Sequence, residues 1–317
     1  MSNVENCCVA CGNAHSVFVL QKMLGKPFPR NVMLKRCEEC QTVFLADWQK
    51  GFIDELYDYY APRIELERRD LYNALNDSRY SQLLGEISHL LSGKKILDVG
   101  CGEGQFVDFA MRRSWEVLGI ELSDSAVALC EKFGLPVKKA DVFDRGLHQA
   151  SFDMIMLSEV IEHVPNLIDF VKRLEQLLAK GGVLYLTTPN FNSLDRRVLG
   201  ADWRVIHPEH ITYFTPRTLS RLVATTSKLE QIFLRTRNIS LPALRRLISP
   251  ISLFRPSTEK RTGEESVSLN DKSRLDEQRL RASIEKSGVM IRLKGMMNDT
   301  LDRLSLGSTI VALYRKP

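Results

Sequence analysis

From Lys94 onward, short apolar runs alternate with segments of helical spacing, and no other feature of the chain constrains its fold as strongly. The runs are KKILDVG, WEVLGIEL, LPVKKADVF, FDMIMLSEV and GGVLYLTTPN. Strands and helices in alternation predict an α/β domain, in which a mostly parallel sheet carries helices on both faces. Ligands of such sheets lie beyond the carboxyl ends of the strands. Functional residues are therefore expected where these runs end.

A glycine-rich turn follows the first run. It reads Asp98-Val-Gly100-Cys101-Gly102 and opens a helix. A dinucleotide-binding loop would carry its third glycine at position 105, which is Gln105 here. The carboxylate of Asp98 would repel a phosphate and suits a cationic group.

Two further carboxylates follow the second and third strands. Glu121 is placed to accept hydrogen bonds from both hydroxyls of a ribose, and Asp141 to accept one from the exocyclic amine of adenine. A cofactor with an amine, a ribose and an adenine but no phosphates fits these strand ends, and S-adenosylmethionine (SAM) is such a cofactor. The same site is expected to include Cys101, Leu122, Val142 and Ser158.

Together these segments resemble the bacterial class I SAM-dependent methyltransferases, of the methyltransferase-23/11-like kind. The resemblance rests on LDVGCGEGQF, GIELS, ADVF, FDMIMLSEVIEHV, LLAKGGVLYLTTPN and HPEHITYFTPRTL. It implies an enzyme with a Rossmann-like, mostly parallel sheet of seven strands. The family pattern puts the methionine end of SAM at Asp98, Gly100 and Gly102, its ribose at Glu121, and its adenine at Asp141 and Val142.

Two CxxC pairs stand near the N-terminus, at Cys8 and Cys11 and at Cys37 and Cys40. This is the spacing of the two knuckles of a zinc ribbon, in which four thiolates close a tetrahedral structural site. Cys7 is a spare thiol that could compete with Cys8 for the metal. The resemblance includes methyltransferases with such a ribbon among enzymes that modify sugars and cell-surface polysaccharides.

The fourth run is followed by Glu159, Glu162 and His163, an ExxEH pattern. If the segment is a helical turn, these positions face one point, and their oxygen and nitrogen donors suit Mg²⁺ or Mn²⁺. The pattern is similar to that of metal-dependent 2′-O-methyltransferases of small RNAs and of ubiquinone-type O-methyltransferases. The resemblance to the RNA enzymes implies His210 as a fourth ligand.

Two other interpretations of this segment stay open. Without a metal, His163 or His210 could act directly as the catalytic base. Alternatively, Glu159 and Glu162 cap the following helix and bond to SAM, while His163 only packs in the core.

The segment 200–210, which we call the lid, lies between the fifth strand and the next helix and should cover the active site. The aromatic rings of Trp203 and Tyr213 could stack on a sugar or a base, and Arg204 and His207 could add polar contacts. Ordinary packing within the lid is the alternative.

The sequence predicts five regions, and the fourth is a helical insertion before the last strand that is basic and partly disordered. The C-terminal part of the chain is basic because there are 17 Lys and Arg against 9 Asp and Glu between Arg235 and Pro317. This insertion could cover the substrate, mediate dimerisation or touch a membrane surface, and the oligomeric state stays open. The regions are a zinc ribbon at 1–50, connecting helices at 51–92, the SAM-binding domain at 93–238, the insertion at 239–305 and the final strand at 306–317.

Composition restricts the partners. No apolar run approaches the ~18 residues of a membrane span, and the first residues lack a secretory signal, so a cytoplasmic location is expected. The net charge of +5 resides in the C-terminal quarter, and the rest of the chain is acidic. A nucleic acid is therefore not expected as a partner, because its binding needs a basic surface. A small-molecule or saccharide substrate is expected instead.

These features predict SAM-dependent methylation of a hydroxyl oxygen on a sugar, a polysaccharide precursor or another small metabolite. Three alternatives remain: sugar C-methylation, RNA 2′-O-methylation, and a catalytically silent scaffold that binds SAM.

Overall fold

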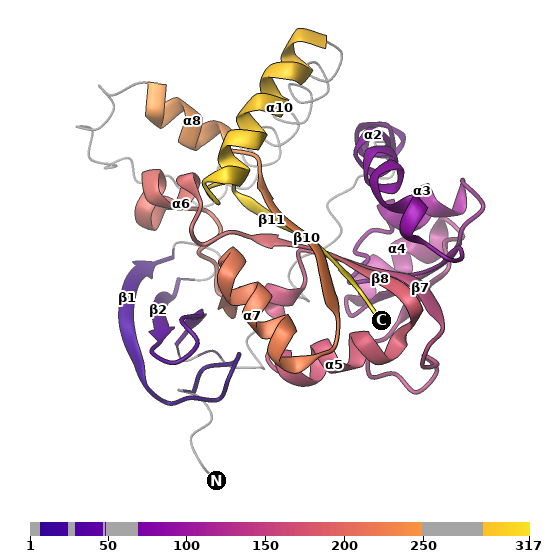
Figure 1. Cartoon of the computed structure of the whole chain (residues 1–317), viewed down its shortest axis with the longest axis horizontal. Coiled ribbons are helices and arrows are strands. Elements are labelled where there is room, and N and C mark those ends of the chain that lie inside the picture. Colours follow the sequence, from indigo (N-terminus) through magenta and orange to yellow (C-terminus); the bar gives the residue numbers. More distant parts are fainter. Residues whose placement is uncertain (1–6, 25–28, 47, 49–68, 249–287) are drawn as a thin grey trace.

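The computed structural model describes residues 7–24, 29–46, 48, 69–248 and 288–317 (Figure 1). Two predicted features lie outside the described residues. They are the part of the connecting helices before residue 69 and the part of the insertion at 249–287.

A seven-stranded sheet forms the centre of the molecule, in the strand order β10-β11-β8-β7-β4-β5-β6. Neighbouring strands from β8 to β6 are parallel, whereas β11 runs antiparallel to both β8 and β10. The predicted α/β class and mostly parallel sheet are confirmed, and the last strand of the chain inserts inside the sheet rather than at its edge. The strands are β4 (Lys95–Val99), β5 (Glu116–Glu121), β6 (Val137–Lys139), β7 (Phe152–Ser158), β8 (Leu178–Pro189), β10 (Glu230–Arg237) and β11 (Thr309–Arg315).

Helices cover both faces of this sheet, because successive side chains of a strand point to opposite faces. Ile96 of β4 packs in the core that includes Phe106 and Phe109 of α3, whereas Leu97 packs in the core that includes Leu174 of α5. Helix α5 is followed directly by a strand, because Leu178 already begins β8. The helices are α2 (Arg69–Ile87), α3 (Gln105–Met111), α4 (Asp124–Lys132), α5 (Leu167–Leu177), α6 (Leu194–Leu199) and α7 (Pro216–Thr226), with the short helices η3 (Ser88–Leu90), η4 (Ile161–His163) and η5 (Gly200–Asp202).

A second sheet joins the N-terminal region to a distant part of the chain. Its four antiparallel strands follow the order β1-β2-β3-β9. The strand β2 was not anticipated from the sequence, and β9 follows the lid. The strands are β1 (Ser16–Met23), β2 (Asn31–Cys37), β3 (Val43–Leu45) and β9 (Thr212–Tyr213).

The described part of the insertion consists of α8 (Leu241–Ile248) and α10 (Gly288–Arg303), which extend from one end of the molecule (Figure 1). The base of α10 is tied to β10, since the amide of Thr236 donates to Asp302 Oδ1 at 2.7 Å. None of the described helices has the length and apolar character that crossing a membrane requires.

Candidate active site

The glycine turn after β4 has the backbone shape of a ligand cradle. Gly100 and Gly102 adopt left-handed φ values of 66° and 53°, which favour glycine. A Cβ atom at Gly100 would lie 2.6 Å from a methyl group of Val160, whereas a Cβ at Gly102 would meet no protein atom within 4 Å. The space beside Gly102 is therefore open to a ligand that approaches the backbone closely.

The carboxylate of Glu121 ties this turn to the end of β5. Its Oε2 accepts from the amide of Gly102 at 2.8 Å, and its Oε1 accepts from the amides of Leu122 and Ser123 at 2.7 and 3.0 Å. The sequence did not reveal this bracing role. A carboxylate has roughly four acceptor positions, so three bonds leave capacity for a ribose hydroxyl.

Asp98 lies beneath the turn and is only 4% exposed. Burial raises the pKa of its carboxyl well above the usual range, and the nearby charges of Glu121 and Cys130 raise it further. A buried carboxylate is costly unless a cation or hydrogen bonds compensate it. The site therefore favours a ligand that brings a positive charge to Asp98.

The other residues predicted at this edge of the sheet differ in exposure. Asp141 is exposed after β6, and its Oδ1 accepts from the amide of Phe143 at 2.8 Å in a tight turn. Leu122 is exposed, Val142 is buried, and Cys101 and Ser158 are half-buried.

Three of the four residues predicted for the reacting face come together. Glu162, His163 and His210 each offer one ligand atom, and these atoms lie within 4.8 Å of one another. The two imidazole rings meet edge to face, with their centroids 4.7 Å apart. Glu162 and His163 lie in η4, whereas His210 comes from the end of the lid.

Both histidines are held by backbone carbonyls. Nδ1 of His163 lies 2.9 Å from the carbonyl of Glu209, and Nδ1 of His210 lies 2.7 Å from the carbonyl of Val205. A carbonyl can only accept, so each Nδ1 carries the proton and each Nε2 keeps its lone pair for a ligand. Burial lowers the pKa of His163 to about 4 and that of His210 well below its usual value, and the neighbouring His163 lowers the latter further.

Glu162 contributes a buried carboxylate oxygen that lacks a hydrogen-bond partner among the described residues. Its side chain is 2% exposed, and its Oε2 accepts from the hydroxyl of Thr188 at 2.8 Å. Its Oε1 is buried and has no hydrogen-bond partner among the described residues. Burial raises the pKa of this carboxyl well above the usual range, and the charge of Glu159 raises it further. One oxygen and two imidazole nitrogens form a donor set that fits a divalent cation.

Glu159 does not join this group, and the helical-turn argument that placed it there was wrong. The residue adopts a left-handed φ of 55° and precedes the short helix η4, so its spacing to Glu162 is not that of an α-helix. Its side chain is exposed, and its backbone amide donates to the carbonyl of Thr187 at 3.0 Å. A left-handed conformation in a residue other than glycine is uncommon and is often found at functional sites.

The four residues predicted to contact the substrate, in the lid and in β9, divide into a buried pair and a more exposed pair. Trp203 and Tyr213 are buried against Phe191 in an apolar cluster, so the expectation that their rings stack on a substrate is not met and the packing alternative describes them. Arg204 is exposed, and His207 is half-buried with its Nδ1 3.4 Å from Glu209 Oε1.

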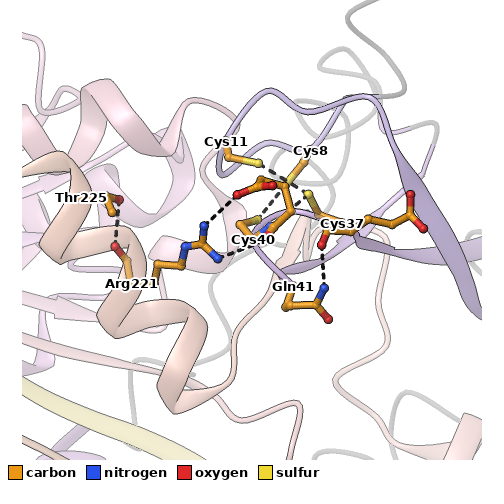
Figure 2. A network of polar contacts seen from close by, with 9 residues as sticks. Cys8, Cys11, Cys37, Cys40, Gln41, Arg221 and Thr225 are labelled. Carbon is orange, nitrogen blue, oxygen red and sulfur yellow. Dashed lines mark hydrogen bonds and ion pairs between the residues drawn. The ribbon is translucent and has the colours of Figure 1, made fainter.

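The four predicted cysteine ligands converge at the N-terminal module (Figure 2). The sulfurs of Cys8 and Cys40 are 3.5 Å apart, as are those of Cys11 and Cys37. Zinc–sulfur bonds of about 2.3 Å in a tetrahedron put the sulfurs about 3.8 Å apart, so this arrangement fits zinc. Cys7 is not part of the cluster.

The strand order and the carboxylates at consecutive strand ends define the class: this is a class I SAM-dependent methyltransferase fold. The sequence model of a family described as "Methyltransferase domain" matches residues 68–226, half of the chain. The chain belongs to this family, and the predicted resemblance is confirmed.

Curated relatives carry a specific name. Two proteins named ubiquinone biosynthesis O-methyltransferase are similar to this chain, one from Azoarcus sp. with 32% identity over 154 residues and one from Acinetobacter baumannii with 31% over 123 residues. These matches cover 41% and 36% of this chain, and they span only 62% and 52% of the length of those relatives.

One solved structure is similar to this chain at low sequence identity. It is a SAM-dependent methyltransferase from Archaeoglobus fulgidus, 17% identical, with a TM-score of 0.49. The alignment covers 84% of this chain and all of that one.

Proposed function

We propose that this protein transfers the methyl group of SAM to a hydroxyl oxygen on a sugar or another small metabolite, with a divalent cation at the reacting face. One observation carries the proposal: Glu162, whose buried Oε1 has no hydrogen-bond partner among the described residues, lies with His163 and His210 in a group whose ligand atoms converge. The printed names of the relatives, which are O-methyltransferases, support oxygen as the methyl acceptor.

The residues at the carboxyl ends of the strands fit SAM. Asp98 offers its buried negative charge to the amino group of the cofactor, the open space at Gly102 admits the methionine portion, and Glu121 has acceptor capacity for the ribose. Asp141 and Val142 are proposed for the adenine. SAM supplies an electrophilic methyl group, and the protein holds the acceptor oxygen in line with it.

The reacting face has to help remove the hydroxyl proton. A divalent cation supplies this chemistry by lowering the pKa of a hydroxyl that it contacts. Glu162 would provide the anionic ligand, and the hydrogen bonds at Nδ1 of His163 and His210 leave the Nε2 atom of each ring available to a cation.

The metal-free alternative makes Nε2 of His163 or His210 the proton acceptor. An imidazole whose pKa is lowered to about 4 is a weak base, and proton transfer is most efficient when the pKa of the base lies near the working pH. The low pKa of His163 therefore favours a role as a metal ligand over a role as the catalytic base. A histidine that stays neutral keeps its lone pair available to a cation at neutral pH.

Other acceptors remain as rivals of the proposal. Sugar C-methylation and RNA 2′-O-methylation use the same cofactor, and a scaffold would bind SAM without turnover. The acidic balance of residues 1–234 argues against RNA, because RNA binding needs a basic surface. We further propose that the four cysteines hold a structural zinc ion.

Calorimetric titration tests the proposal. Chelator-treated protein that retains its zinc is titrated with S-adenosylhomocysteine and then with Mn²⁺, and the titrations are repeated on Glu162→Gln and Glu159→Gln. We expect cofactor binding in all three proteins and Mn²⁺ binding that is lost only in Glu162→Gln. The Glu159→Gln variant is the matched control, since it neutralises a neighbouring carboxylate outside the converging group.

Two results would overturn the proposal in different ways. Cofactor binding without Mn²⁺ binding in the unmodified protein would return proton removal to His163 or His210. Failure to bind S-adenosylhomocysteine would remove the cofactor assignment itself.

A further inference from the structure

The N-terminal module and the active site share one sheet. Strand β3 pairs with β9, so that Val43 lies opposite Tyr213 and Phe44 opposite Thr212. The ladder continues one step toward the lid, because the amide of Leu45 donates to the carbonyl of Ile211 at 2.8 Å. A strand as short as β9 is held in place mainly by its neighbours.

The residues beside β9 reach the reacting face directly. The amide of Ile211 donates to the carbonyl of Glu162 at 2.9 Å, so the residue after His210 is bonded to the module through its carbonyl and to η4 through its amide. Nδ1 of His163 in turn bonds to the carbonyl of Glu209. The position of His210 relative to Glu162 and His163 therefore depends on the backbone that β3 supports.

Tyr213 closes the turn that carries His210. Its hydroxyl donates to the carbonyl of His207 at 3.2 Å and accepts from the amide of the same residue at 3.4 Å. Its ring is buried and lies 6.1 Å from that of His210. Tyr213 thus fixes the backbone three residues before His210 while its own backbone lies opposite Val43 of the module.

The cysteine cluster connects to the same region through packing. Cys8, Cys37 and Cys40 are buried in one core with Phe44 of β3 and with Phe214, the residue after β9. Phe214 also forms an isolated β-bridge with Asn190, which anchors the chain just after β9. Between the lid and Phe214, the chain forms β9, and β9 pairs with β3 of the N-terminal module.

We propose that the four-cysteine site and Tyr213 position the active-site histidine, so that zinc occupancy sets the affinity of the Glu162–His163–His210 group for its cation. This inference rests on the proposed function. It makes Tyr213 a positioning residue and the module a part of the active site. Coupling between two sites is reciprocal, so filling the second site also strengthens the retention of zinc.

The experiment uses the full chain and the variant Cys11→Ser, since Cys11 is the exposed member of the cluster and its loss disturbs packing least. Zinc content, Mn²⁺ affinity and S-adenosylhomocysteine affinity are measured on the same preparation, together with amide hydrogen exchange over residues 43–45 and 205–213. We expect zinc to be lost, Mn²⁺ binding to weaken about tenfold or more, exchange at Leu45 and Ile211 to accelerate, and cofactor affinity to stay within about twofold.

Two further variants separate positioning from folding. Cys7→Ser changes a neighbouring thiol outside the cluster and should leave every readout unchanged. Tyr213→Phe keeps the buried ring and the zinc ligands, so it should retain zinc but weaken Mn²⁺ binding and speed up exchange in the turn at 207–210. It also provides the test if Cys11→Ser does not fold.

The outcomes separate this inference from the proposed function. Loss of zinc with unchanged Mn²⁺ affinity and unchanged exchange at Ile211 would overturn the coupling, as would unaltered Mn²⁺ binding and exchange in Tyr213→Phe. If the unmodified protein binds no Mn²⁺, the proposed function fails, and hydrogen exchange alone still decides whether the module holds the lid.

Discussion

Asp98 and Glu162 present the same physical problem at two places in the molecule. Both are buried carboxylates with pKa values raised by burial, and among the described residues no Lys or Arg forms an ion pair with either of them. Their surroundings differ. Asp98 lies under a glycine turn with open space beside Gly102, whereas Glu162 lies beside two neutral imidazoles. The comparison indicates an organic cation for the first site and a metal ion for the second.

The largest effect on binding is expected from a substitution of Asp98, which should change cofactor affinity but not Mn²⁺ affinity. Asp98→Asn removes the charge proposed to pair with the cofactor amine, and S-adenosylhomocysteine affinity should fall by about 10- to 100-fold, the range for a hydrogen bond to a charged group. Mn²⁺ affinity should be unchanged, since Asp98 is not part of the Glu162 group. Calorimetry on the variant checks both values, and a loss of Mn²⁺ binding in Asp98→Asn would show that the two sites are not separate.

The raised pKa of Asp98 predicts a pH dependence of cofactor binding. The bound amine requires the carboxylate form, so below the pKa of the free protein each binding event must release a proton. Affinity should therefore rise with pH, by up to about tenfold per unit, and level off above that pKa. In Asp98→Asn this slope should disappear, and a slope that persists in the variant would assign the titration to another group.

A smaller effect is expected from the hydroxyl that supports Glu162. Thr188→Val keeps the side-chain shape but removes the donor to Oε2, and outer contacts of this kind change metal affinity by roughly 10-fold. Thr187→Val is the matched control, because the hydroxyl of Thr187 contacts Ser158 and the side chain of Glu159 rather than Glu162. Mn²⁺ titrations of the two variants should differ, and equal affinities would mean that Glu162 does not depend on this bond.

The smallest effect concerns the outer contact between the N-terminal module and α7, seen in Figure 2. Arg221 pairs with Glu39 at 3.1 Å, but both side chains are well exposed. Exposed ion pairs contribute about 0.2–1 kcal/mol, so Arg221→Ala should lower the free energy of unfolding by no more than that and leave Mn²⁺ affinity unchanged. A large loss of Mn²⁺ binding in Arg221→Ala would show that the N-terminal module acts on the active site through this ion pair rather than through β9.

The grouping of the three carboxylates at one edge of the sheet could be predicted from sequence, because each lies at or just after the end of a strand that is visible as a short apolar run. Asp98, Glu121 and Asp141 lie within one stretch of the chain, and parallel strands bring their ends to one edge of the sheet. What the sequence did not contain was the bond from Glu121 to the amide of Gly102, which depends on the shape of the turn.

The reacting face was predicted less completely because its geometry comes from distant segments. His210 could be placed only through a resemblance, and the exclusion of Glu159 follows from a left-handed backbone that no helical spacing reveals. Trp203 and Tyr213 were assigned to a substrate because aromatic residues in a lid suit stacking, yet strand β3 of the N-terminal module helps to bury them. Pairing between β3 and β9 leaves no local pattern in the sequence.

The most direct test of the account is a crystal of the protein soaked with Mn²⁺ and S-adenosylhomocysteine, with data collected for anomalous scattering of manganese. We expect one manganese peak in contact with Glu162, His163 and His210, and electron density for the cofactor against Asp98 and Gly102. Cofactor density without a manganese peak at those three residues would contradict the metal-assisted mechanism.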